Sequence, residues 1–159
     1  MNRWLGLVAL LAAVPLSAKD SLGVYSSWAA FRDAETPRCY AIAQSEQRKD
    51  SDPQGYASVG TWPSREVRGQ FYMRLSRGVS GSARVRLAIG RQRFTLSASG
   101  TDAWAADKAM DAAIVAAMRS APSMSVYARS RNGRRFADRY SLEGVATAMD
   151  AALLGCAQL

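Results

Sequence analysis

Bulky apolar residues are frequent in two short segments near the start of the chain, where they are typical of β-strands. Residues 24–31 carry Val, Tyr, Trp and Phe, and residues 38–44 alternate small apolar residues with Tyr, Ile and Gln. Both patterns predict strands, and the intervening residues 33–37 predict a turn. Weaker patterns of the same kind predict strands over residues 56–62 and 70–76.

A polar segment interrupts this series of strands. Residues 45–55 are rich in charged side chains, include one Pro and contain no aliphatic side chain. Because such a segment has nothing to bury, we expect a long solvated loop here.

Residues 84–96 predict a β-hairpin that turns at Gly90-Arg91. A type II′ turn needs a positive φ at its first central residue, which glycine adopts without strain. A two-residue loop at this place fixes the whole register. The predicted cross-strand pairs are Leu87 with Phe94, Val85 with Leu96, Arg86 with Thr95, and Ala88 with Arg93.

A second hairpin is predicted over residues 124–142, around the three-residue loop Arg131-Asn132-Gly133. Gly133 can take the left-handed position that such a loop requires. A two-residue Asn-Gly loop would instead mix apolar and charged side chains on one face, so we prefer the longer loop. The predicted pairs are Ala128 with Phe136 and Met124 with Tyr140 on the inner face, and Arg129 with Arg135 and Ser125 with Arg139 on the outer face.

Two helices complete the predicted elements. Residues 105–120 place apolar side chains on one stripe, with Asp107 near the positive end of the helix dipole and Arg119 near the negative end. Ser141 is a plausible N-cap for a last helix that runs to Cys156. The apolar positions at helical spacing are Met110, Ile114, Ala117 and Met118 in the first helix, and Leu142, Val145, Met149, Ala152, Leu153 and Cys156 in the second.

We expect one mostly β domain of the α+β class over residues 19–159, an antiparallel sheet or β-sandwich with hairpins and two packed helices.

Residues 1–18 have the features of a secretory signal peptide. Arg3 supplies the positive charge, residues 4–16 supply the apolar region, and small residues precede the polar start at Lys19. We expect cleavage after Ala18. An uncleaved membrane anchor is the alternative, but it needs a longer apolar run, and no other segment is long and apolar enough to span a membrane.

Export affects how the two cysteines of the chain are interpreted. Cys39 and Cys156 are the only possible pair, and an oxidising compartment allows them to form a disulfide. Such a bridge would close more than a hundred residues and tie the last helix to an early strand. Two unconnected buried thiols are the alternative.

The composition excludes several kinds of chemistry. The chain of 159 residues contains no histidine, so Ser-His and Cys-His nucleophile pairs and the common His-containing zinc sites are all excluded. Asp107 and Asp111 stand four residues apart on a predicted helix, but Lys108 between them and a solvated face argue against an acid–base pair. Trp28, Trp62 and Trp104 are more typical of core or rim anchors than of a sugar-stacking platform. We predict no catalytic residues, no metal and no cofactor.

Positive charge is the most conspicuous property of the chain. The formal net charge is +8, and removal of Arg3 with the signal leaves +7; only three of the basic residues are lysines. The second hairpin carries Arg129, Arg131, Arg135 and Arg139, while Arg84, Arg86, Arg91 and Arg93 lie on the first. Arginine binds phosphate and carboxylate groups well, so we hypothesise that Arg129, Arg131, Arg135 and Arg139 form a face for an anionic partner. The alternative is a solvated sheet face in an arginine-rich chain, and nucleic acid is not expected as the partner.

The chain resembles the invasion-associated locus B (IalB) family of exported alphaproteobacterial proteins. The matching residues are Trp28-x-x-Phe31, Cys39-Tyr40, Asp102-Ala103-Trp104, Asp107-Lys108, Ile114-Val115-Ala116-Ala117-Met118, Asp138-x-Tyr140-Ser141-Leu142-x-Gly144, and Cys156. The resemblance implies a β-rich domain in the envelope of a Gram-negative bacterium, periplasmic or secreted, and brings no catalytic residues. The family's name comes from a host-cell invasion phenotype.

We therefore expect an exported, non-enzymatic binding or structural protein of the cell envelope, associated with host interaction or invasion, whose partner is an anionic envelope component or a protein. The alternative is an enzyme that processes envelope carbohydrate or peptide through carboxylates. That alternative requires two acidic side chains that share a cleft.

Overall fold

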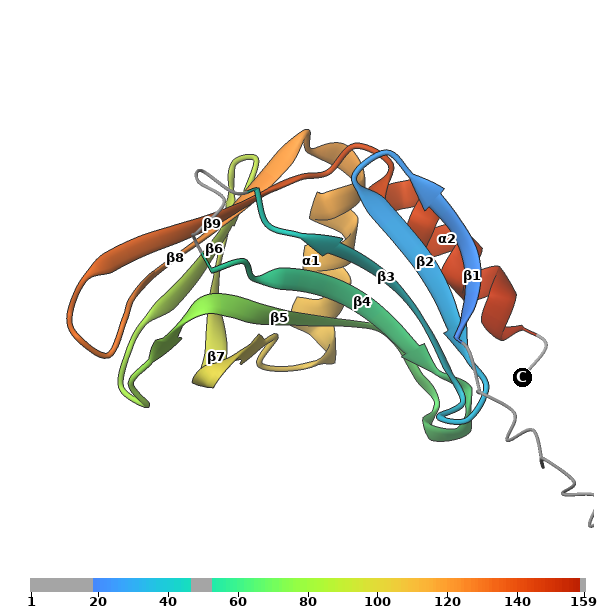
Figure 1. Ribbon diagram of the computed structural model, residues 1–159, viewed down its shortest axis with the longest axis horizontal. Helices are drawn as coiled ribbons and strands as arrows, with labels where there is room; N and C mark the ends of the chain where they lie inside the picture. The colour runs from blue at the N-terminus through green and yellow to red at the C-terminus, as the bar shows by residue number, and fades with distance from the viewer. Residues whose placement is uncertain (1–18, 47–52, 158–159) are drawn as a thin grey trace, which may run out of the picture.

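The computed structural model describes residues 19–46 and 53–157 of the chain (Figure 1). The predicted signal peptide and the middle of the predicted loop, residues 47–52, lie outside the described residues. The elements are β1 (Asp20–Tyr25), β2 (Trp28–Asp33), β3 (Arg38–Gln44), β4 (Tyr56–Trp62), the 3-10 helix η1 (Pro63–Arg65), β5 (Val67–Val79), β6 (Val85–Ile89), β7 (Gln92–Trp104), α1 (Lys108–Ser120), β8 (Ser123–Arg129), β9 (Arg135–Ser141) and α2 (Val145–Cys156).

The nine strands among the described residues form one antiparallel sheet in the order β1-β2-β3-β4-β5-β7-β6-β8-β9. The long strand β7 connects the two halves of this sheet, because its first residues pair with β6 and its last residues pair with β5. Helix α2 packs on β1 to β4, and α1 packs mainly on β5, as Figure 1 shows. The predicted α+β class, mostly β with two packed helices, is confirmed.

The core lies between the sheet and the two helices. Along β3, Cys39 and Ala41 are buried while Tyr40 and Ile42 alternate with them, as the two-residue period of a strand requires. Trp28 is fully buried, and its indole N–H donates to the carbonyl oxygen of Ser141 at 2.9 Å. This bond satisfies a buried donor and joins β2 to the end of β9.

The disulfide predicted between Cys39 and Cys156 is present, with an S–S distance of 2.10 Å and a Cα–Cα distance of 5.6 Å. It joins β3 to the last residue of α2. Since the two cysteines are 117 positions apart, the bridge fixes the C-terminal helix on the N-terminal half of the sheet.

Both predicted hairpins are confirmed, including every predicted cross-strand pair. Gly90 opens the first turn with a φ of 52°, and Gly133 has a φ of 78° in the second loop. The strands β5 and β7 are longer than the sequence pattern predicts, because they cross from one half of the sheet into the other.

The prediction of a single strand over residues 24–31 is wrong. A turn at Ser26 and Ser27 divides this segment into β1 and β2, and Tyr25 pairs with Trp28 across the turn. The φ of Ser26 is 52°. The bulky residues that suggested one strand therefore belong to two antiparallel strands, and the two serines between them are the turn residues.

The predicted start of the last helix is also wrong. Ser141 ends β9, and α2 begins at Val145 after Gly144, whose φ is 84°. Leu153, predicted on the buried stripe, is 45% exposed. The shifted start follows from the close approach of Gly144 to the β1–β2 turn, where a Cβ atom would lie 1.9 Å from the carbonyl oxygen of Tyr25.

Two smaller differences concern α1 and the polar loop. Helix α1 begins three residues later than predicted, at Lys108, because Asp107 is its N-cap and accepts a hydrogen bond from the Met110 amide at 2.8 Å. The ends of the predicted solvated loop are not all exposed, since Ser45 is buried and its hydroxyl accepts a hydrogen bond from the Gly55 amide at 3.0 Å.

Removal of the disulfide should destabilise the protein without changing its fold. We expect a double Cys39→Ala, Cys156→Ala variant to lose about 2 to 4 kcal/mol of unfolding free energy, since the unfolded chain is no longer constrained. Urea unfolding followed by circular dichroism measures this loss. Wild-type protein treated with a reductant should match the variant, and unchanged midpoints in both samples would contradict the prediction.

Replacement of Gly144 should be more damaging than replacement of another glycine with positive φ. Both Gly144→Ala and Gly133→Ala place a side chain in the left-handed region, which costs about 1 to 2 kcal/mol. Only at Gly144 does the new Cβ also meet backbone, since nothing lies within 4 Å of the corresponding position at Gly133. Thermal unfolding should show a clearly lower midpoint for Gly144→Ala, and equal midpoints would show that the contact with Tyr25 does not constrain this position.

Candidate anion-binding groove

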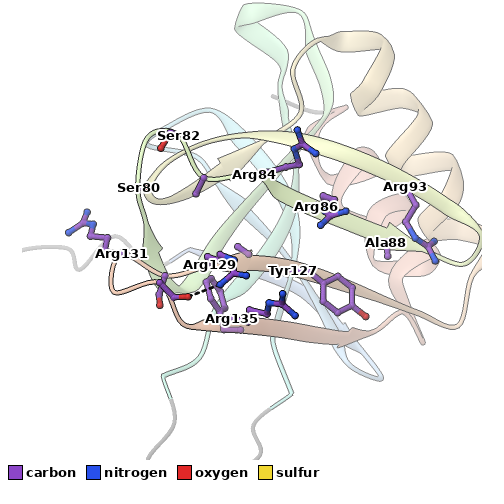
Figure 2. A pocket seen from close by; sticks show the side chains of 15 residues that line it. Ser80, Ser82, Arg84, Arg86, Ala88, Arg93, Tyr127, Arg129, Arg131 and Arg135 are labelled. Carbon is purple, nitrogen blue, oxygen red and sulfur yellow. Dashed lines mark hydrogen bonds between the residues drawn. The ribbon is translucent and has the colours of Figure 1, made fainter.

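A groove of about 740 Å³ lies on the outer face of the second half of the sheet (Figure 2). Strands β6, β8 and β9 and the segment that precedes β6 contribute most of its lining. Arg93, at the start of β7, also lines it. The charged residues of the lining are Arg84, Arg86, Arg93, Arg129, Arg131 and Arg135, with Tyr127 and Phe136 as the aromatic ones. No Asp or Glu within residues 19–46 and 53–157 is part of this lining.

The strand registers bring these side chains together. Arg129 stands directly opposite Arg135, and Tyr127 stands opposite Arg86 on the neighbouring strand β6. Side chains directly opposite each other in an antiparallel pair are near neighbours on one face. Ala88 pairs with Arg93 across the strands. Its side chain is small and leaves the hollow open between the longer side chains.

The four arginines of the predicted face do not all lie in the groove. Arg129 and Arg135 lie near the centre of the groove beside Tyr127, as Figure 2 shows. Arg131 lies at the hairpin tip, beside the backbone of Gly78 and Gly100. Arg139 is exposed on the same strand as Arg135, opposite Ser125, and is not part of the lining.

The predicted face omits three arginines that line the groove, namely Arg84, Arg86 and Arg93. Each is visible in the sequence of the first hairpin, but only the pairing of β6 with β8 brings that hairpin next to the second one. This pairing joins residues about forty positions apart, such as Arg86 and Tyr127, and has no local sequence signal.

Positive charge in the groove is poorly compensated. Arg129 donates from Nη1 to the Gly133 carbonyl oxygen at 3.0 Å, and Arg93 donates to the carbonyl oxygens of Gly90 and Gln92. The ion pairs found among residues 19–46 and 53–157 all lie elsewhere, and they join Arg32 to Asp20, Arg38 to Asp33 and Arg119 to Asp150. Like charges that face each other on a sheet repel, so a bound anion would relieve this repulsion.

The carboxylates of Asp107 and Asp111 each accept a backbone hydrogen bond that stabilises the fold. Asp107 caps α1, and Asp111 accepts a hydrogen bond from the Phe71 amide at 2.8 Å. Burial raises the pKa of the Asp111 carboxyl, although the bond from Phe71 acts in the opposite direction.

A second hollow of about 390 Å³ adjoins the arginine groove and contains two acidic residues, Glu46 and Asp138. Asp138 is buried, and its carboxylate accepts hydrogen bonds from the Ser76 amide at 2.8 Å and from the Ser76 hydroxyl. Nearby, burial and the charge of Asp138 raise the pKa of the Tyr140 hydroxyl. Since both carboxylate oxygens of Asp138 already bind β5, this residue joins β9 to β5 and is poorly suited to exchange protons with a substrate.

Metal ligands are not grouped in the described part of the chain, where no three His, Cys, Asp or Glu side chains could hold an ion together. None of the helices within residues 19–46 and 53–157 is long and apolar enough to cross a membrane.

Comparison with known proteins gives two findings. A family model described as "Invasion associated locus B (IalB) protein" matches residues 28–153. A solved structure, the crystal structure of invasion associated protein b from Bartonella henselae, has a similar fold with a TM-score of 0.62 and 17% sequence identity. The similarity covers 87% of this chain and 97% of the Bartonella chain. No curated protein matches the sequence.

Replacing one arginine of the central pair should stabilise the protein. In Arg135→Glu, a carboxylate faces Arg129 in place of a second guanidinium, and we expect a gain of about 0.5 to 1 kcal/mol in unfolding free energy. Arg139→Glu is the matched control on the same strand, because its partner Ser125 is uncharged. Urea unfolding at low salt measures both, and an equal effect of the two substitutions would contradict the proposed repulsion.

Proposed function

This chain belongs to the invasion-associated locus B family, and from that premise we propose that it is an exported envelope protein that binds an anionic partner without catalysing a reaction. Residues 1–18 are then a leader cleaved after Ala18, and residues 19–159 are the single domain that acts outside the cytosol. The protein works in the periplasm or at the outer surface of a Gram-negative bacterium. Its part in host invasion is through binding.

The disulfide supports export. Disulfides persist in oxidising compartments and are rare in the cytosol of mesophiles. The bond between Cys39 and Cys156 is also a main link between the C-terminal helix and the sheet. A protein that depends on such a link is suited to the periplasm or the cell exterior.

The observation that carries the proposed binding function is the arginine groove. Six arginines line one hollow of about 740 Å³, and no carboxylate of the described residues lines it with them. Guanidinium groups bind phosphate oxygens through paired hydrogen bonds, which a lysine-rich surface cannot reproduce. We infer that the natural partner bears phosphate groups at an envelope surface, such as those of anionic phospholipids or lipopolysaccharide.

Vesicle flotation across a salt series tests this function. We expect the protein to float with phosphatidylglycerol-containing vesicles at low salt and to dissociate toward 1 M salt, where the Debye length falls to about 3 Å. Phosphatidylcholine vesicles should not bind it. Soluble inorganic triphosphate should compete, and the degree of competition separates recognition of the phosphate group from recognition of a lipid surface.

Two double variants that change the net charge by the same amount separate the groove from the rest of the basic surface. Arg129→Glu with Arg135→Glu should abolish flotation, while Arg65→Glu with Arg68→Glu, at exposed positions of η1 and β5 outside the groove, should retain most of it. Circular dichroism should show that both variants are folded. If the two double variants lost flotation equally, net charge and not the groove would explain binding, and the proposed function would be wrong.

A further inference from the structure

A second open surface lies on the first half of the sheet, on the face turned away from the helices. The disulfide shows which side of the sheet this surface is on. Cys39 faces α2, and the next residue along the strand, Tyr40, therefore faces the side without helices. On this side Tyr40, Tyr56 and Tyr72 stand on β3, β4 and β5, and all three are only partly buried. Figure 1 shows the strands with both helices behind them.

These aromatic residues line a groove of about 440 Å³ together with Trp62, Ser58 and Gln70. The rings of Tyr56 and Tyr72 are neighbours, with centroids 5.9 Å apart. Gly60 also lines the groove, and the indole of Trp62 lies against it, since a Cβ atom at Gly60 would be 2.6 Å from the six-membered ring of Trp62. The absence of a side chain at Gly60 thus lets an aromatic ring lie close to the sheet.

Polar groups lie among the rings. Ser58 offers a hydroxyl and Gln70 an amide, and the tyrosines carry hydroxyls of their own. The Tyr72 hydroxyl donates to Asp102 on β7. Burial and the bond to Asp102 raise the pKa of Tyr72, so its hydroxyl stays neutral and fixed in orientation.

The charged residues in this lining are cationic. Lys19 and Arg38 line the groove, and no Asp or Glu in the part of the chain that the structure describes does so. Arg38 lies over the ring of Tyr40 with its Cζ 5.0 Å from the centroid, and its Nη2 contacts Asp33 at 3.4 Å. Its Nε, however, is buried and has no hydrogen-bond partner in the described part of the chain. The Arg38 side chain as a whole is 33% exposed, so a ligand in the groove would meet the exposed part of its guanidinium and not Nε.

We propose that this groove binds an acidic oligosaccharide, whose sugar rings stack on the aromatic side chains and whose carboxylate binds near Arg38 and Lys19. A sugar ring has an apolar C–H face and a rim of hydroxyls, which matches rings interleaved with Ser58 and Gln70. A carboxylate matches the positive charge that Lys19 and Arg38 place in the lining. The site lies on a different half of the sheet from the arginine groove and does not depend on the function proposed for it.

Isothermal titration calorimetry with tri-galacturonic acid and its neutral methyl ester tests this proposal. The protein is purified after export, so that its disulfide is formed. We expect saturable binding of the acid and weaker binding of the ester. Trp62→Ala should weaken both by about tenfold, while Arg38→Gln should weaken only the acid, also by about tenfold.

Two variants on the other half of the sheet serve as controls. Tyr127→Ala removes an exposed aromatic residue and Arg135→Glu removes a positive charge, and both lie in the arginine groove. Both should bind tri-galacturonic acid as the wild type does. Thermal unfolding checks that Trp62→Ala and Arg38→Gln are folded, and the charge-selective effect of Arg38→Gln tests the site even if Trp62→Ala unfolds.

Three outcomes would overturn the proposal. The first is no saturable binding of tri-galacturonic acid at millimolar concentration. The second is equal loss in the Tyr127→Ala and Trp62→Ala variants. The third is a wild-type dimer, seen by sedimentation, that dissociates in Trp62→Ala without any sugar binding, since a second copy of the chain would then cover this face.

Discussion

The pairing of β6 with β8 determines where the positive charge of this protein gathers. Each hairpin by itself has a simple pattern, with apolar side chains on one face and polar or charged ones on the other. When β6 pairs with β8, the apolar faces of both hairpins join the core, and their arginines must then share the opposite face. Burial of Leu87 and Val126 thus drives together charges that repel one another. The stability of the core offsets this repulsion, and the result is a groove lined by six arginines.

Contacts between distant segments hold the remaining half of the molecule together. The disulfide holds α2 on β3, and the bonds from Trp28 to Ser141 and from Ser27 to Glu143 hold the first two strands on the segment before α2. Asp138 connects β9 back to β5 through Ser76. Contacts between distant parts of the chain therefore fix both ends of the sheet. This arrangement leaves two faces open, one rich in arginine and the other rich in aromatic rings, and both lie on regular strands.

Local chemistry explains which features the sequence could predict. Gly90 and Gly133 mark turns whose backbone geometry excludes most other residues, so both hairpin registers follow from turn type and apolar pairing. The cysteine pair was predictable because the chain has only two cysteines.

By contrast, the turn at Ser26-Ser27 lies between residues with strong strand preference and has no glycine or proline to mark it. The start of α2 depends on the contact of Gly144 with Tyr25, which is not visible in either segment alone. For the candidate site, Arg129 and Arg135 could be paired from one hairpin, whereas their proximity to Arg86 depends on long-range strand pairing.

We propose that the groove, and not basic surface in general, recognises anions. Arginine Nε–H resonances measured by nuclear magnetic resonance during titration with inorganic pyrophosphate test it most directly. The resonances of Arg86, Arg129 and Arg135 should shift in a saturable way, while those of Arg32 and Arg119, which are paired with carboxylates, should not. Small, unsaturable shifts of similar size at all five arginines would contradict the claim.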